Sequence, residues 1–238
     1  MASVSSKFVV VDGINTHYLE GGNGPALVFL HSGEFGGAAE VSWEFNIDAF
    51  AEHFHVIAPD WLGFGRTDKV FDFEKGRART LGHMRRFLEV MAIGEADFVG
   101  NSMGGSNLAR IAAARPVILP IRSLVLASGG GYAPDSDARK KLLRYDGTDR
   151  SMREMLDGLF FDKEKWVDNA EYRARRQVFA RMPGAWECAS AARFKAPFVE
   201  ATGQFGKPDA TPYENIEVPT LLIAGANDEL RLPGYAHE

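Results

Sequence analysis

The sequence predicts an α/β protein with a mostly parallel sheet, helices on both faces of the sheet, and a helical segment inserted late in the chain. Short apolar runs rich in β-branched residues recur between helical stretches. Their continuous rather than alternating hydrophobicity is typical of strands buried on both faces of a parallel sheet. A long, charged stretch of helical periodicity precedes the last run. With 238 residues, the chain is long enough for one core and this insertion.

Seven runs are expected to be strands, at residues 8–11, 16–20, 26–30, 55–58, 96–99, 123–127 and 220–224. The first two runs flank the residues DGIN, and Asp-Gly between two such runs is typical of a tight hairpin. The sheet is therefore expected to begin with an antiparallel pair and to continue with parallel strands.

Residues 134–213 are expected to form a helical lid inserted after the sixth strand, with residues 1–133 and 214–238 as the core. Two parts of this insertion, SMREMLDGLFFD at 151–162 and NAEYRARRQVFARM at 169–182, have helical patterns. An insertion of this length exceeds an ordinary loop. Because the ends of parallel strands form a ligand-binding crevice, a lid over a pocket is favoured over extra surface helices.

Composition narrows the range of partners. Lys and Arg number 27 against 32 acidic residues, and the formal net charge is -5, so no basic surface for nucleic acid is expected. No apolar run approaches the roughly 18 residues of a membrane helix, and the first residues lack the pattern of a secretory signal. The single cysteine, Cys188, cannot form an intrachain disulfide, which suits a reducing compartment. We expect a cytoplasmic protein that acts on a small molecule.

The residues GNSMG at 100–104 match the nucleophile-elbow pattern G-x-S-x-G. They lie between an apolar run and an Ala-rich helical stretch, which is the strand, turn and helix context that the pattern requires. Ser102 is therefore the expected nucleophile. Its backbone is expected to be strained, and the flanking glycines to allow close packing against neighbouring elements.

An oxyanion hole needs two backbone N–H groups directed at one point. Met103, which follows the nucleophile, is expected to supply one of them. The third strand leads into HSGEFGG, and there Gly33 is the expected second donor.

Asp228 is the expected acid of a catalytic triad, because it follows the last predicted strand within TLLIAGANDEL. A histidine base would then be expected roughly 20–30 residues further along, after one more helix and strand. The sequence ends ten residues after Asp228. We therefore expect that the final strand and helix of the fold, and the triad histidine, are missing, and that the chain is nearly inactive as given. His237 is expected to lie at the start of a helix, and Asp60 to shape a loop.

The sequence resembles the α/β-hydrolase fold family over nearly its whole length, and within it the meta-cleavage product hydrolases, which cleave C–C bonds. The resemblance rests on GNSMGG, on VIAPDWLGFGRTDK at 56–69 and on RARRQVFARMP at 173–183. It implies that Ser102 attacks a carbonyl, that Asp228 orients a histidine, and that Gly33 and Met103 hold the oxyanion. It also implies that Asn101 and Arg175 bind the dienoate end of the substrate.

The resemblance implies no metal or organic cofactor, and relatives of this kind are often homo-oligomers. The loop HSGEFGG departs from the family's more glycine-rich run, which affects any substrate contacts made there. Two other functions stay open, a carboxylester hydrolase with the same triad and a non-catalytic ligand-binding relative that has lost its histidine. A dehalogenase or epoxide hydrolase is disfavoured, because the elbow of those enzymes carries Asp and this chain has Ser102.

Overall fold

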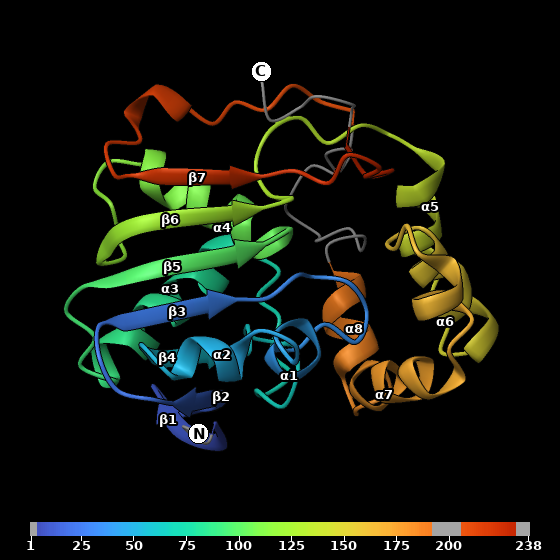
Figure 1. Cartoon of the computed structure of the whole chain (residues 1–238), viewed down its shortest axis with the longest axis horizontal. Helices are drawn as coiled ribbons and strands as arrows, with labels where there is room; N and C mark the ends of the chain where they lie inside the picture. The colour runs from blue at the N-terminus through green and yellow to red at the C-terminus, as the bar shows by residue number, and fades with distance from the viewer. Residues whose placement is uncertain (1–3, 192–205, 232–238) are drawn as a thin grey trace.

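The structure, a computed structural model, describes residues 4–191 and 206–231. Within these residues, seven strands form one sheet in the order β1-β2-β4-β3-β5-β6-β7 (Figure 1). The strands are β1 (Ser5–Val11), β2 (Ile14–Gly21), β3 (Ala26–Leu30), β4 (His55–Pro59), β5 (Ala96–Asn101), β6 (Ile121–Ala127) and β7 (Thr220–Ile223). All seven expected strands are present.

The sheet begins with the expected hairpin. β1 and β2 pair antiparallel from Ser5 opposite Glu20 to Val11 opposite Ile14. The two turn residues between them, Asp12 and Gly13, have positive φ of 49° and 83°, which matches the twist of a two-residue hairpin. β2 is also antiparallel to β4, and every later pair is parallel. The expectation of an antiparallel start followed by parallel strands is confirmed.

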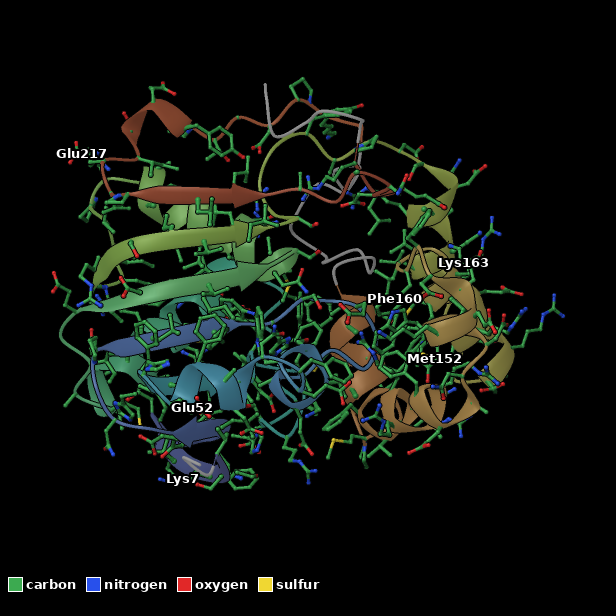
Figure 2. All side chains as sticks on the ribbon, in the orientation of Figure 1. Lys7, Glu52, Met152, Phe160, Lys163 and Glu217 are labelled. Atoms are coloured by element: carbon green, nitrogen blue, oxygen red, sulfur yellow. The ribbon has the colours of Figure 1, made fainter. Side chains whose placement is uncertain are left out.

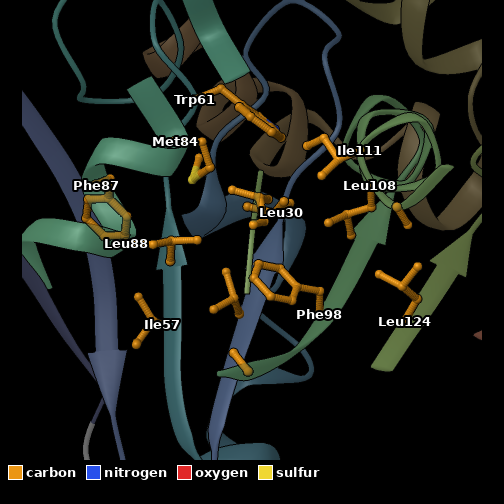
Figure 3. Packing of buried hydrophobic residues seen from close by; sticks show 14 of the residues in the cluster. Leu30, Ile57, Trp61, Met84, Phe87, Leu88, Phe98, Leu108, Ile111 and Leu124 are labelled. Atoms are coloured by element: carbon orange, nitrogen blue, oxygen red, sulfur yellow. The ribbon is translucent and has the colours of Figure 1, made fainter. Parts of the chain in front are cut away.

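Helices cover both faces of the sheet. Successive residues of a strand point to opposite faces, so Val28 and Leu30 face one side and Leu27 and Phe29 the other. The first side packs against α3 (Arg77–Val90) and α4 (Met103–Ala113), which contribute Met84, Phe87, Leu88, Leu108 and Ile111 (Figure 3). The second side packs against α1 (Ala39–Ser42) and α2 (Ile47–Ala51), with Trp43 between them.

Among the described residues between β6 and β7 there are four α-helices, namely α5 (Asp137–Leu143), α6 (Asp149–Asp157), α7 (Ala170–Ala180) and α8 (Ala185–Ser190), with a π-helical turn, η1 (Lys163–Val167). We call them the inserted helices. Side-chain oxygens of Ser136, Thr148 and Asn169 accept backbone N–H groups where α5, α6 and α7 begin, which satisfies donors left open at a helix start. Figure 1 shows the inserted helices beyond the arrowheads of the parallel strands.

The inserted helices have a small hydrophobic core of their own. Met152 and Met155 of α6 and Tyr172 of α7 are buried together, and Phe160 packs against them (Figure 2). Phe35, from the loop after β3, is buried in the same cluster. The insertion is therefore joined to the main sheet by apolar packing as well as by the chain.

The expectation that every parallel strand is buried on both faces is wrong for β7. Leu221, Leu222 and Ile223 are exposed by 57%, 38% and 49%. β7 is the last strand of the described sheet and pairs only with β6 among the described residues. A buried-strand sequence pattern cannot by itself tell a central strand from one at the edge. A single 3-10 turn, η3 (Tyr213–Asn215), precedes β7 in the chain and contacts α4.

A substitution of Phe98 tests the packing of the core at the centre of the sheet. Its side chain is fully buried on β5 between α3 and α4, so Phe98→Ala is expected to lower the free energy of unfolding by about 3–5 kcal/mol. Phe161 is 72% exposed, and Phe161→Ala should change it by less than about 0.5 kcal/mol. Urea denaturation of both variants measures the difference, and equal losses would contradict this description of the core.

Candidate active site

Ser102 is the single residue between the end of β5 and the start of α4, and its backbone conformation is one that serine rarely adopts. Its φ is 52° and its ψ is -108°, and a non-glycine residue held at such angles stores about 1–3 kcal/mol of strain. The Ser102 N–H donates to Ala127 O at 2.9 Å, and Ser102 O accepts from the Ser106 N–H at 2.8 Å. The turn is thus fixed on one side by β6 and on the other by the first turn of α4.

Three glycines let this turn pack closely. A Cβ atom on Gly104 would lie 2.1 Å from Leu30 O, and one on Gly100 would lie 2.5 Å from Gly105 N. A Cβ atom on Gly105 would in turn come within 2.8 Å of Gly100 O. Any side chain at these positions would push α4 away from β3 or β5, so the glycines are needed for the strained turn to form.

Gly33 lies against the side chain of Met103, so the two residues expected to supply the oxyanion hole are neighbours. A Cβ atom on Gly33 would be 2.5 Å from Met103 Sδ and 3.1 Å from Met103 Cβ. Met103 is the first residue of α4, so its N–H has no partner within the helix. The structure therefore brings Gly33, Met103 and Ser102 together at the carboxyl edge of the sheet.

His31 holds the start of the loop that carries Gly33. Its Nδ1 donates to Ser32 O at 2.6 Å, and its Nε2 accepts the Trp61 N–H at 3.0 Å. The Trp61 indole N–H donates back to His31 O at 2.9 Å. Burial lowers the pKa of His31 below its ordinary value. With both ring nitrogens engaged, His31 supports the loop and is not placed to act as a base.

Asp60 organises the same region, in keeping with its expected loop-shaping role. It accepts hydrogen bonds from His17 Nδ1 at 2.7 Å, the Ala39 N–H at 2.7 Å and the Arg66 N–H at 2.8 Å. Burial would raise the pKa of Asp60, but the hydrogen bond from His17 and the charge interaction with His31 lower it below its ordinary value. The carboxylate ties β2, β4 and the start of α1 together.

Asp228 lies at the same edge of the sheet as Ser102, in the turn after β7. Its Oδ1 accepts the Leu230 N–H at 2.8 Å, and its own N–H donates to Gly225 O at 3.3 Å. Because β7 pairs with β6, and β6 with β5, the ends of all three strands point the same way. Asn101 is half-buried and lies beside Ala127 at the last β5 position in the pairing with β6.

None of the five described histidines forms a hydrogen bond with Ser102 or Asp228. His17 and His31 belong to the Asp60 network, His55 pairs with Glu20 at 2.7 Å, His83 contacts Thr16 at 3.0 Å, and His53 is exposed. His237 lies outside the described residues. Within the described ranges, no three His, Cys, Asp or Glu side chains are grouped as metal ligands, and no helix is long and apolar enough to cross a membrane.

The two neighbouring arginines of α7 make different contacts. Arg175, the residue that the sequence predicted for substrate binding, has a side chain 48% exposed and donates to Glu44 Oε2 at 2.5 Å. Arg176 is buried and pairs with Glu34, one residue after Gly33. The structure therefore brings Arg176, rather than Arg175, to the loop beside Ser102.

Sequence reasoning missed the Glu34 and Arg176 pair. One signal was present, since Glu34 is the only acidic residue in the loop HSGEFGG, which otherwise has three glycines. A buried acid needs a partner, but the sequence did not say which of the closely spaced arginines of α7 would supply it.

The sheet order, the strained serine between β5 and α4, and the helices inserted after β6 are features of an α/β hydrolase. A model of the alpha/beta hydrolase family matches residues 27–238, and the chain belongs to this family.

Two curated relatives are each 30% identical to the chain. One is the 2-hydroxy-6-oxo-6-(2'-aminophenyl)hexa-2,4-dienoic acid hydrolase of Metapseudomonas resinovorans, aligned over 94% of this chain and 75% of that protein. The other is the 2-hydroxymuconate semialdehyde hydrolase of Pseudomonas sp. strain CF600, aligned over 93% of this chain and 77% of that protein.

Solved structures give the same fold. A meta-cleavage product hydrolase from Pseudomonas fluorescens IP01 is similar with a TM-score of 0.78 and 24% identity, covering 96% of this chain and 82% of that one. A serine hydrolase involved in carbazole degradation is similar with a TM-score of 0.71 and 28% identity, covering 94% and 80%.

Two glycine substitutions test how closely the turn is packed. Gly104→Ala places a methyl group against Leu30 O, and we expect it to lower the free energy of unfolding by more than about 2 kcal/mol. Gly82 lies in α3 with no atom within 4 Å of the position of an added Cβ, so Gly82→Ala should raise it by about 0.5–1 kcal/mol. Thermal denaturation compares the two, and a neutral Gly104→Ala would show that the turn is not tightly packed.

Proposed function

We propose that this chain is a serine hydrolase that cleaves a C–C bond in a ring-fission product of aromatic degradation, an acid of the 2-hydroxy-6-oxo-dienoate type. The observation that carries the proposal is the strained Ser102 beside Gly33 and Met103. The relatives named above support the substrate class, since their names describe hydrolases of such acids.

In the proposed reaction, the dienol substrate is first converted to its keto form. The Ser102 hydroxyl, or a water molecule, then attacks the carbonyl carbon remote from the carboxylate. The N–H groups of Gly33 and Met103 stabilise the negative oxygen that forms. The C–C bond breaks, and its electron pair is delocalised through the conjugated double bond onto the 2-oxo oxygen, so that a dienolate forms and its oxygen takes up a proton to give the 2-hydroxydienoate. Water completes the release of a carboxylic acid, so that one water molecule is consumed overall.

The remaining roles follow the resemblance. Asp228 would orient a histidine base, Asn101 would contact the dienoate end, and residues 134–213 would form a lid over the site, on a core of residues 1–133 and 214–238. Arg175 would bind the substrate carboxylate, since its planar guanidinium suits bidentate recognition of that group. It would have to exchange its present partner, Glu44, for the substrate.

One observation favours a second candidate, a carboxylester hydrolase that uses the same serine. Arg175 and Arg176 are each paired with a glutamate, Glu44 and Glu34. With both guanidinium charges compensated in this way, neither arginine attracts a substrate carboxylate in the present arrangement, which suits an uncharged ester at least as well as an acid.

Ser102→Ala tests the proposed nucleophile. Turnover of a ring-fission acid should be lost while binding, followed by tryptophan fluorescence, is kept. Ser5→Ala, which removes an exposed hydroxyl on β1, should keep both. The assays are run with and without imidazole. Imidazole supplies a general base from solution, so the test does not depend on which group of the protein is the base.

Unchanged turnover in Ser102→Ala would contradict the nucleophile assignment. If the unmodified chain binds the acid but does not turn it over, with or without imidazole, the proposed enzymatic function is contradicted. A non-catalytic ligand-binding protein is then favoured.

Arg175→Gln distinguishes the two enzyme candidates. If Arg175 binds the substrate carboxylate, the variant should lose about 10- to 100-fold in kcat/KM with ring-fission acids, the effect of one charge-assisted hydrogen bond. It should change little with a neutral p-nitrophenyl ester. Arg153→Gln removes an exposed pair with Asp168 on the inserted helices and should alter neither. Equal losses with both substrates would remove the proposed role of Arg175.

A further inference from the structure

The loop that follows β3 is attached to the inserted helices by three successive residues. Glu34 forms an ion pair with Arg176, and the ring of Phe35 lies 4.9 Å from the ring of Tyr145, measured between centroids. Gly36, with φ of 78°, has room for no side chain, because a Cβ atom there would lie 2.6 Å from Arg176 O. The loop and α7 are therefore in backbone contact as well as in side-chain contact.

The ion pair at this junction is buried. Glu34 is 8% exposed and Arg176 is 5% exposed. The Arg176 Nε–H also donates to the Tyr172 hydroxyl at 3.1 Å, so two sides of the guanidinium are fixed. A buried pair of this kind is strongly disrupted when one partner is removed, since the other charge is left without compensation.

Glu34 is held in its ionised form by these neighbours. Burial would raise its pKa, but the positive charge of Arg176 and hydrogen bonds from Ser32 and Arg176 lower it below its ordinary value. Arg176 in turn loses hydration on burial, but the charge of Glu34 raises its pKa. Both groups are therefore charged at neutral pH. Their contact is a charge-assisted hydrogen bond, which fixes the orientation of both side chains.

The other end of the loop is equally constrained. His31 is bound to Trp61 through two hydrogen bonds, and Gly33 lies against Met103. Gly33 is thus placed between an anchor in the sheet at His31 and an anchor on α7 at Glu34. A backbone N–H between two fixed points has a fixed direction, which is what a pre-organised oxyanion donor requires.

We propose that the Glu34 and Arg176 pair positions the Gly33 N–H for catalysis, so that helix α7 is part of the catalytic framework and does more than cover the site. Arg176 is a positioning residue in this account, because it acts through Glu34. The proposal rests on the proposed function, since it takes Gly33 to be an oxyanion donor.

The first measurement is kinetic, with a p-nitrophenyl ester as substrate and imidazole present. Because a misplacement of about 1 Å in a reacting group can cost on the order of 10²-fold, Arg176→Gln should lower kcat by about 10- to 100-fold and change KM by less than about threefold. Arg173→Gln is the matched control, since Arg173 lies on the same helix and pairs with Asp149 within the inserted helices. It should leave both constants unchanged.

A double variant separates positioning from loss of folding. Glu34→Gln combined with Arg176→Gln leaves no buried charge, and the two amides can hydrogen-bond to each other. It should recover most of the kcat lost in Arg176→Gln. A double variant no better than the single one would overturn the proposal.

The second measurement is hydrogen–deuterium exchange, which needs no activity. The Gly37 N–H donates to Glu34 O at 2.8 Å and so reports on closure of the loop. Exchange in the peptide covering 31–38 should rise by at least about tenfold in Arg176→Gln, the effect of losing about one fixed contact. It should not rise in Arg173→Gln.

The outcomes separate this proposal from the proposed function. Unchanged exchange in Arg176→Gln would overturn the inference whatever the enzyme does. Faster exchange with unchanged kcat, while Ser102→Ala abolishes turnover, would also overturn it and leave the function standing. Faster loop exchange with turnover unaffected by Ser102→Ala would overturn it together with the proposed function, because Gly33 would then have no oxyanion to bind.

Discussion

The structure around the candidate site depends on one constraint, the strained backbone of Ser102. A serine at φ of 52° is kept there only if its surroundings define the turn more strongly than the strain opposes it. The bond from Ser102 to Ala127, the start of α4 and the close approach of Gly104 to Leu30 provide that definition. Strand β6 and strand β3 therefore both contribute to the direction in which the serine points.

The same constraint explains why the loop after β3 lies where it does. Since Gly104 packs on the end of β3, the first residues beyond that strand pass directly over the start of α4, and Gly33 meets Met103. The loop continues onto α7 through Glu34 and Phe35. Packing thus runs without interruption from the sheet, through the proposed oxyanion donors, to the inserted helices.

Much of this arrangement could be predicted from the sequence. Strand positions follow from apolar runs, because a strand buried on both faces has few alternatives. Ser102, Gly33 and Met103 could be placed together because their roles depend on local patterns after neighbouring strands. The contacts between the side chains of α7 and the loop after β3 could not be predicted in this way. Arg175 and Arg176 differ by one position, about 100° around α7, and only the three-dimensional packing decides which of them reaches Glu34.

The sequence also could not predict that β7 is exposed, or which residue is the partner of Asp228. The apolar run of β7 is the same whether one or both of its neighbours are present, so the pattern predicted burial that the described sheet does not provide. Asp228 has the turn geometry of a residue after a strand, but a triad depends on a partner brought from elsewhere in the chain. That partner depends on tertiary structure, and local patterns do not identify it.

The central claim is that the strained turn makes Ser102 the reactive group of this protein. Reaction of the folded chain with a fluorophosphonate in the presence of imidazole, followed by peptide mass spectrometry, tests this most directly, because the reagent bonds covalently to an activated serine hydroxyl. The account predicts a single adduct, on the peptide that contains Ser102, which does not form when the protein is unfolded in urea before the reagent is added. An adduct on another serine of the folded chain, or equal labelling of folded and unfolded protein, would contradict it.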